Sequence, residues 1–237
     1  MNFSEAERGL KDRIHHLFSQ KHPSKGVVVE GFDEQIERVQ TLQRRMRAHR
    51  ALMEARAQRK MVISKAKSAI RRAMYRLNDN ATFMSFDVEC VLDTSTITEI
   101  GVTMLTNGEK SAFNYRVEGV ESKCSEFIHG ETIVLPLPEI IERLQAHAEE
   151  ADNFVGHSLY LDFDFLKDNG VRLPEKWYAD TASWSAIHCE SGALKLVDLA
   201  KMYGVDHSAP HCGGNDSYTT LEVMLAMVQK IGMEPKA

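Results

Sequence analysis

Several features that mark well-known protein classes are missing from this sequence. Its four cysteines form no CxxC pair, so neither a disulfide scaffold nor a paired zinc site is expected. No apolar run approaches the roughly 20 residues of a membrane span, and the N-terminus lacks the apolar segment of a signal peptide. These absences predict a cytoplasmic protein without membrane association.

The common catalytic signatures are absent as well. The chain has no P-loop, no HExxH and no GxSxG. The tripeptide HCE at 188–190 is not followed by PCxxC, which excludes a zinc deaminase. Cys189 and Cys212 each follow a histidine, but no paired spacing supports a zinc site.

Charge is distributed unevenly along the chain. Residues 1–80 hold 18 Lys+Arg and 9 Asp+Glu, whereas residues 81–237 hold 11 Lys+Arg and 25 Asp+Glu. The two parts therefore carry net charges of +9 and −14. Such a division indicates a basic binding segment joined to an acidic catalytic or metal-binding domain.

Residues 1–80 are predicted to be a helical extension. An apolar stripe over 4–20 favours a short amphipathic helix, and 27–30 favours a brief extended segment. Neither Gly nor Pro occurs over 33–77, which predicts one long helix or two collinear helices. NDNA at 78–81 ends this segment and gives the domain boundary.

Residues 81–237 have the pattern of an α/β domain. Segments 81–89, 97–105 and 111–117 predict an antiparallel three-strand meander, with a turn at 106–110. A helix over 138–150 and a strand over 152–157 follow. Further helices are expected over 159–170, 193–204 and 215–232, so a mixed sheet flanked by helices is predicted.

Two carboxylates on the first strand are candidates for metal binding. Asp87 and Glu89 are two residues apart, so both side chains point to the same face of a strand, and Phe86 and Val88 point to the other. Two adjacent carboxylates repel each other and attract a divalent cation. A strand edge with ordinary solvated acids is the alternative.

Two further segments carry acidic residues in settings that suggest a site. Asp162 and Asp164 lie on one predicted helix but about 200° apart, so only one of them can face a site, and the local sequence does not choose between them. His211 and Asp216 flank a glycine pair that permits a tight entry to the last helix. A histidine there suits general-base chemistry, whereas Asp216 or Asn215 could instead simply cap the helix.

Taken together, FDVE…TEIG, GHSLYLDFDFL and HCGGNDSYTTL resemble the three motifs of the DEDDh 3′→5′ exonucleases of the RNase H-like superfamily. The resemblance spans residues 82–230 and implies an RNase H-like exonuclease fold. In the family pattern the second aspartate lies six residues after the glycine, and counting from Gly156 this selects Asp162.

The resemblance implies a site of four carboxylates, Asp87, Glu89, Asp162 and Asp216, with His211 as general base. Two Mg²⁺ or Mn²⁺ ions would be held there, one by Asp87, Glu89 and Asp216, the other mainly by Asp87 and through water by Asp162. The implied reaction releases nucleoside 5′-monophosphates from single-stranded DNA or RNA. Cys90, where the family usually has threonine, and Ser158, where asparagine is common, depart from the pattern.

The basic extension suggests a second function. Its cations are Arg44, Arg45, Arg47, Arg50, Arg56, Arg59, Lys60, Lys65, Lys67, Arg71, Arg72 and Arg76. They would attract a polyanion that the acidic domain repels, which favours nucleic-acid binding. A protein partner or self-association through these helices is the competing interpretation, although the heptad pattern is ragged. A non-catalytic nucleic-acid-binding or adaptor protein acting through this arm is the alternative to the enzyme.

Overall fold

The computed structural model describes residues 32–91, 93–124, 126–189 and 192–232, together with Gly9 and Asp12. The expected helix over 4–20 and the extended segment over 27–30 lie outside this range, apart from the two isolated residues. Contacts divide the chain into two units, Met1–Lys60 and Met61–Ala237. No helix among the described residues is both long and apolar enough to cross a bilayer.

A single helix, α2, runs from Phe32 to Asn78, as the absence of helix breakers predicts. Its side chains over 37–58 are almost all exposed, whereas Ile70 and Ala73 near its end are fully buried. Those two residues pack into a core cluster with Phe83, Leu221 and Met224. The compact second unit therefore begins at Met61 and includes the last turns of α2, whereas the composition shift places the boundary after Asn80.

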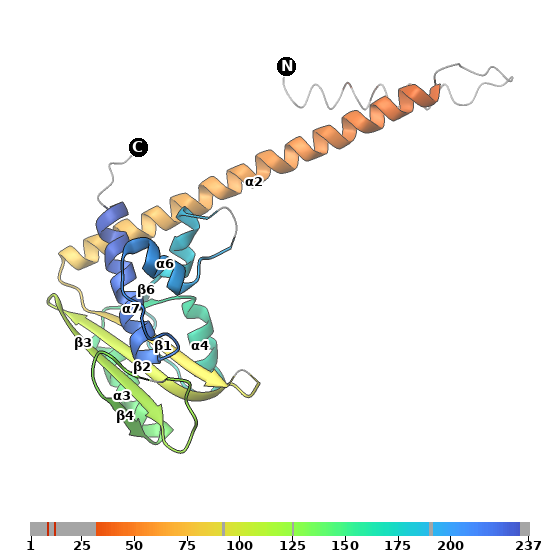
Figure 1. Ribbon diagram of the computed structural model, residues 1–237. Coiled ribbons are helices and arrows are strands. Elements are labelled where there is room, and N and C mark those ends of the chain that lie inside the picture. The colour runs from red at the N-terminus through yellow and green to blue at the C-terminus, as the bar shows by residue number, and fades with distance from the viewer. Residues whose placement is uncertain are drawn as a thin grey trace. The chain divides into compact units, whose positions relative to one another are not determined.

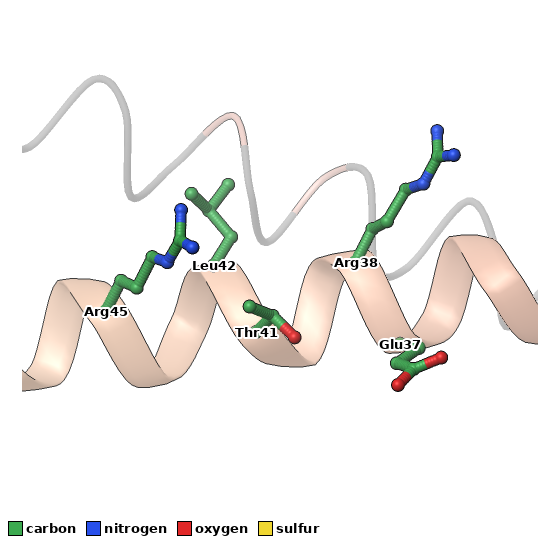
Figure 2. Close-up of a pocket in the computed structure, with 5 residues that line it drawn as sticks. All are labelled: Glu37, Arg38, Thr41, Leu42 and Arg45. Carbon is green, nitrogen blue, oxygen red and sulfur yellow. The ribbon is translucent and has the colours of Figure 1, made fainter.

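The first unit contains a pocket of about 530 Å³ on the early turns of α2 (Figure 2). Its described lining consists of Glu37, Arg38, Thr41, Leu42 and Arg45. Arg38, Leu42 and Arg45 project to the same side of the helix, as their spacing of four and three residues requires. This lining holds two cations, one carboxylate and one apolar side chain, and none of the acidic residues expected to bind metal.

The second unit is built on a six-stranded sheet in the order β4-β3-β2-β1-β5-β6 (Figure 1). β1 (Phe83–Val91), β2 (Thr96–Thr106) and β3 (Glu109–Val117) form the expected antiparallel meander. β5 (Asn153–Gly156) pairs in parallel with β1. β4 (Thr132–Leu135) and β6 (Trp177–Asp180) extend the two edges in parallel pairings.

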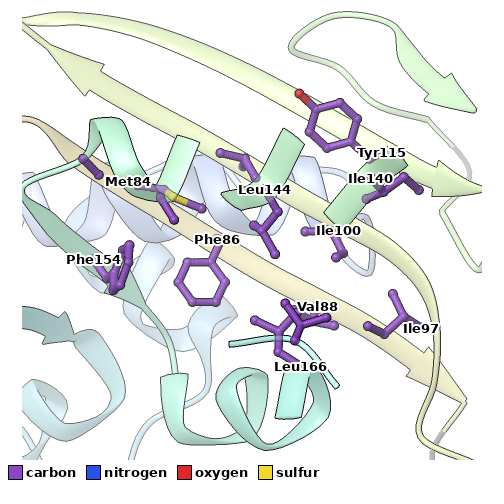
Figure 3. Packing of buried hydrophobic residues seen from close by; sticks show 14 of the residues in the cluster. Met84, Phe86, Val88, Ile97, Ile100, Tyr115, Ile140, Leu144, Phe154 and Leu166 are labelled. Atoms are coloured by element: carbon purple, nitrogen blue, oxygen red, sulfur yellow. The ribbon is translucent and has the colours of Figure 1, made fainter. Parts of the chain in front are cut away.

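Helices cover both faces of this sheet. On one face, α3 (Leu137–Glu150) and α4 (Leu159–Asp168) pack against the alternate apolar residues of the meander. Figure 3 shows this core, in which Met84, Phe86 and Val88 of β1 lie near Leu144 and Leu166 of the two helices. The arrangement confirms the expected mixed sheet with flanking helices.

The opposite face of the sheet is covered by α7 (Gly213–Met227), which continues as a π-helical turn over Val228–Gly232. α6 (Leu196–Tyr203) and the last turns of α2 pack against the same cluster. α5 (Thr181–Trp184) and the 3₁₀ turn Ser185–Ile187 connect β6 to this layer.

Several local expectations were wrong. The strands β4 and β6 were not predicted, because each has only four residues and no clear alternation. The last two long helices begin at Leu196 and Gly213, and not at 193 and 215.

Candidate active site

The alternation of β1 sets the direction of the first two carboxylates. Phe86 and Val88 are buried in the core beneath α3 and α4, so Asp87 and Glu89 point to the opposite face, where α7 lies. Both carboxylates are half-buried. A register shift between Glu89 and Cys90 interrupts the regular pairing just beyond them, and pairing continues at Cys90 and Val91. The strand thus delivers two acidic groups to one place, as its period of two predicts.

Asp162 reaches the same place because β1 extends further than β5. The parallel ladder between the two strands stops at Ser85, so the backbone N–H of Val88 has no partner from β5. That N–H donates to Oδ1 of Asp162 over 2.9 Å. Asp162 is buried and lies in the first turn of α4, whereas Asp164 is exposed. The structure therefore makes the choice between the two aspartates that the local sequence leaves open.

The start of α7 lies directly on β2. A Cβ atom at Gly101 would lie 1.8 Å from the carbonyl carbon of Gly213, and one at Gly214 would lie 2.6 Å from the Phe127 ring. The glycine pair is therefore required for close packing of a helix on a sheet, and not for a turn before the helix, as the sequence suggested. The residue with a left-handed backbone is His211, with φ of 62°.

Two buried polar side chains from the meander bind the first backbone N–H groups of α7. Gly213 donates to Oε1 of Glu99 over 2.8 Å, and Gly214 donates to Oδ1 of Asn114 over 2.9 Å. A carboxylate at a helix N-terminus also interacts favourably with the helix dipole. Glu99 is in turn held by the Ser122 hydroxyl, 2.8 Å away, and by Arg116. These contacts fix the position of the helix that carries Asp216.

Sequence reasoning missed the roles of Glu99 and Asn114. The alternation of β2 could have revealed the first, since Glu99 and Gly101 share a strand face and pair with Glu89 and Asp87 across the meander. The idea that Asp216 or Asn215 caps the final helix was wrong, because the N-cap is Cys212. Asn215 instead bridges two backbone carbonyls, those of Glu126 and Ala209.

Asp216 lies in the first turn of α7 and is buried. Its Oδ2 accepts the backbone N–H of His211 over 3.0 Å, and its Oδ1 lies 2.6 Å from Nε2 of His207. Ligand atoms of Glu89, His211 and Asp216 all lie within 4.8 Å of one another. The exposed imidazole of His211 is thus brought beside two of the carboxylates. His207 was not recognised in the sequence.

The electrostatics of the site favour a bound cation. Burial, together with the charges of Asp162, Asp216 and Glu89, holds the pKa of Asp87 well above its ordinary value. Burial also raises the pKa of Asp162 to about 8 and raises that of Glu89. Ionised carboxylates crowded in this way are destabilised unless a positive charge is added. Oxygen donors of this kind are the ligands that Mg²⁺ and Mn²⁺ prefer, so the residues fit a divalent metal site.

A pocket of about 290 Å³ extends from Glu89. Its other described lining residues are Cys90, Val91, Asp93, Thr98, Glu121 and Lys123. Cys90 therefore lines a space next to the carboxylates, where the resemblance implies handling of a terminal nucleotide.

The remaining candidate residues lie elsewhere. The arginines at 44, 45, 47, 50 and 56 lie on exposed turns of α2 in the first unit. The guanidinium groups of Arg72 and Arg76 lie over the Trp177 ring, each 5.3 Å from its centroid. Cys212 is buried against Cys124 and Phe127, and among the described residues it groups as a possible metal ligand with Glu99 and Cys124, not with Cys189.

A four-carboxylate cluster with a neighbouring histidine, on one face of a mixed sheet, has the donor groups that a nuclease-type metal site requires. In agreement, the family model described as DEDDh_C, the C-terminal domain of DNA polymerase III subunit epsilon-like proteins, matches residues 117–227. Residues 117–227 therefore resemble the DEDDh exonuclease family, and the mixed six-stranded sheet with flanking helices fits an RNase H-like α/β fold. The matched range contains Asp162, His211 and Asp216.

Individual relatives are distant. The uncharacterized protein YDR514C of Saccharomyces cerevisiae is 26% identical and covers 64% of this chain, which spans 42% of that relative. The Neurospora crassa Pan2 catalytic unit is 15% identical over 63% of this chain and 27% of its own, with a TM-score of 0.47. The Saccharomyces cerevisiae Pan2 UCH-Exo module in complex with A7 RNA is 15% identical, with 62% of this chain and 28% of that chain covered and a TM-score of 0.44.

Proposed function

We propose that this protein is a metal-dependent 3′→5′ exonuclease that releases nucleoside 5′-monophosphates from single-stranded ends of DNA or RNA. The observation that carries the proposal is the convergence of Asp87, Glu89, Asp162 and Asp216 with the imidazole of His211. These residues come from β1, α4 and the start of α7, and the three elements are held together by specific contacts. An arrangement of acids that is costly without a cation supports a metal-binding role over a structural one.

The carboxylates would hold two Mg²⁺ or Mn²⁺ ions. Asp87, Glu89 and Asp216 would bind one ion, and the other would be held mainly by Asp87 and through water by Asp162. When bound, such ions supply charge that stabilises the attacking and leaving oxygens of a phosphodiester.

His211 is suited to remove the proton of the attacking water. Its side chain is exposed, its backbone is tied to Asp216, and it lies close enough to Glu89 for their charges to interact. A histidine is an effective general base near neutral pH. A ring nitrogen of His211 lies within 4.8 Å of carboxylate oxygens of Glu89 and Asp216.

The pocket beside Glu89 supports action at a chain end. It has a volume of about 290 Å³ and is lined by Asp93 and Glu121 as well as Glu89, with Lys123 as its cation. An excess of carboxylates disfavours a phosphate and accommodates hydroxyl and amino donors. A terminal nucleoside without a 3′-phosphate fits this chemistry.

The neighbouring aspartates of α4 provide a matched test. Digestion of 5′-labelled single-stranded DNA and RNA would be followed on gels with Mg²⁺, Mn²⁺ or EDTA. The wild type is expected to shorten one or both substrates from the 3′ end, and EDTA is expected to stop the reaction. Asp162→Asn is expected to slow cleavage by more than about 100-fold, because it removes a metal ligand.

Asp164→Asn is the control, since Asp164 is exposed and lies two positions further along the same helix. It is expected to leave the rate within about twofold of the wild type, as other exposed substitutions do. Equal rates in the two variants, or no cleavage by the wild type with either metal, would contradict the proposed function.

The exposed cations of α2 in the first unit are proposed to bind the phosphates of the nucleic acid. Over 37–58 the helix lacks a buried stripe, so its cations remain at the surface and a long coiled coil is disfavoured. Phosphate contacts by exposed cations give sequence-independent affinity that falls with salt. Binding without cleavage, lost when these cations are replaced, would favour the adaptor function over the enzyme.

A further inference from the structure

One side-chain contact at the site is not explained by the four carboxylates and His211. The imidazole Nε2 of His207 lies 2.6 Å from Oδ1 of Asp216. A carboxylate that binds a metal ion accepts hydrogen bonds, so for Asp216 in that role the proton lies on Nε2 and His207 is the donor. Oδ2 of the same carboxylate accepts the backbone N–H of His211. Each oxygen of Asp216 is therefore held by one donor, which fixes the plane of the carboxylate.

The contact is buried. The side chains of His207 and Asp216 are 8% and 11% exposed, so water has limited access to replace the donor if the histidine is removed. A buried hydrogen bond to a carboxylate is shorter and stronger than one between neutral groups. The other ring nitrogen, Nδ1, is buried and has no hydrogen-bond partner among the residues that the structure describes. The polar contact of His207 is thus directed at Asp216.

The segment that carries His207 is tied at several points. Gly204 ends α6 in a left-handed conformation, and the N–H of Val205 returns to the carbonyl of Ala200. The carbonyl of Asp206 accepts the hydroxyl of Thr219 from α7, at 3.3 Å. Beyond His207, the carbonyl of Ala209 accepts the side-chain amide of Asn215, so the backbone is anchored on both sides of the contact.

We propose that His207 is a positioning residue, which orients the Asp216 carboxylate for metal binding without touching substrate. This inference rests on the proposed function, because it assigns Asp216 as a metal ligand. Partners that orient a ligand from behind commonly change metal affinity by about 10- to 100-fold when they are removed.

The test measures Mn²⁺ affinity by electron paramagnetic resonance, independently of cleavage, in three variants. The amide nitrogen of glutamine can reach the position of Nε2, whereas that of asparagine is too short to do so. His207→Gln is therefore expected to bind Mn²⁺ within about threefold of the wild type, and His207→Asn and His207→Ala about 10- to 100-fold more weakly. Cleavage by the weak binders should recover in part at high Mn²⁺.

His188→Ala is the matched control. His188 also forms a histidine hydrogen bond, to the Tyr203 hydroxyl at 2.7 Å, but lies outside the carboxylate cluster. It should leave Mn²⁺ affinity unchanged. If His207→Ala does not fold, as judged by circular dichroism, the contrast between glutamine and asparagine decides alone.

The outcomes separate this inference from the proposed function. Equal Mn²⁺ affinity in the glutamine and asparagine variants and the wild type would overturn the role of His207, even if the wild type cleaves. A wild type that binds Mn²⁺ with the expected ranking of variants, yet cleaves neither DNA nor RNA, would support the role of His207 and reject the nuclease. A wild type that binds no Mn²⁺ would reject both.

Discussion

Gly101 of β2 and Gly213 of α7 lie in backbone contact, and this contact sets how closely α7 approaches the sheet. A Cβ atom at Gly101 would lie 1.8 Å from the carbonyl carbon of Gly213, and one at Gly213 would lie 2.7 Å from the Gly101 nitrogen. Gly101 pairs with Asp87 across the meander. The two glycines therefore bring Asp216, three residues into the helix, next to the carboxylates of β1.

Substitution of Gly101 by alanine should consequently damage both stability and the site. The new methyl group meets backbone atoms, which cannot move away by changing a rotamer, so a loss of about 3 kcal/mol in the free energy of unfolding is expected. Urea unfolding measures this loss, and weaker Mn²⁺ binding by the folded fraction would report the displacement of α7. Gly108→Asn is the control, because nothing lies within 4 Å of Gly108 and asparagine tolerates its φ of +84°. Equal effects of the two substitutions would contradict the packing argument.

The Gly101 contact also shows where inference from sequence succeeds and where it stops. Asp87 and Glu89 were placed correctly because the period of a strand decides which side chains share a face. The second motif needed the family spacing to select Asp162. Asp162 and Asp164 lie on different faces of one helix, and the local sequence does not show which face meets the site. The glycine pair was predicted to permit a tight turn, whereas it permits close packing on β2. This packing could not be predicted, because Gly101 and Gly213 are 112 positions apart in the sequence.

His207 and Glu99 were missed for a related reason. His207 reaches Asp216 through irregular backbone, to which no periodicity applies. Glu99 reads as one polar residue in an alternating strand, although it is fully buried and binds the start of α7. The architecture of meander, central helices and last helix follows from local pattern, whereas the polar contacts that align these elements depend on how they meet.

The metal-free protein should lose stability as the pH rises. Burial raises the pKa of Asp162 from an ordinary 3.8 to about 8, so between these values the folded state holds a proton that the unfolded state has released. The free energy of unfolding contributed by this group therefore falls from about pH 4 towards about pH 8. Asp162→Asn keeps an acceptor for the Val88 N–H but does not titrate.

In EDTA, the free energy of unfolding of the asparagine variant should increasingly exceed that of the wild type as the pH rises across this range. Urea unfolding at each pH measures this difference. Mn²⁺ should stabilise the wild type at pH 8 more than the variant, because the variant keeps three of the four carboxylates but lacks the repulsion from a charged Asp162. If the free energy of unfolding depended on pH in the same way in both proteins, the pKa of Asp162 would not be raised in the folded state.

Ser158 offers a site for stabilisation without loss of activity. Its backbone is left-handed, with φ of 66° and ψ of 41°, and its side chain makes no capping hydrogen bond. Asparagine adopts this conformation more readily than serine, so Ser158→Asn should raise the free energy of unfolding by about 0.5 kcal/mol. The Ser158 N–H that donates to Asp180 is retained. Ser158→Val, with a branched side chain, should lower stability by about 1 kcal/mol or more; the reverse order would refute the argument.

The cations of α2 should control the salt dependence of nucleic-acid binding. Replacing Arg44, Arg45, Arg47 and Arg50 together by glutamine is expected to weaken binding of a long single-stranded oligonucleotide, because up to four phosphate contacts are lost. The slope of log affinity against log salt concentration should then fall by up to about 3. Fluorescence anisotropy over a range of NaCl concentrations measures both quantities.

Four exposed cations of the second unit, Lys167, Arg172, Lys195 and Lys201, give a control with the same change in net charge. Their replacement should leave the slope nearly unchanged, since only cations that lie on the bound strand release counterions. Cleavage of a dinucleotide should be equal in both quadruple variants, because the carboxylate site is intact and so short a substrate does not need the arm. A similar loss of slope in both variants would mean that net charge alone, and not α2, attracts the nucleic acid.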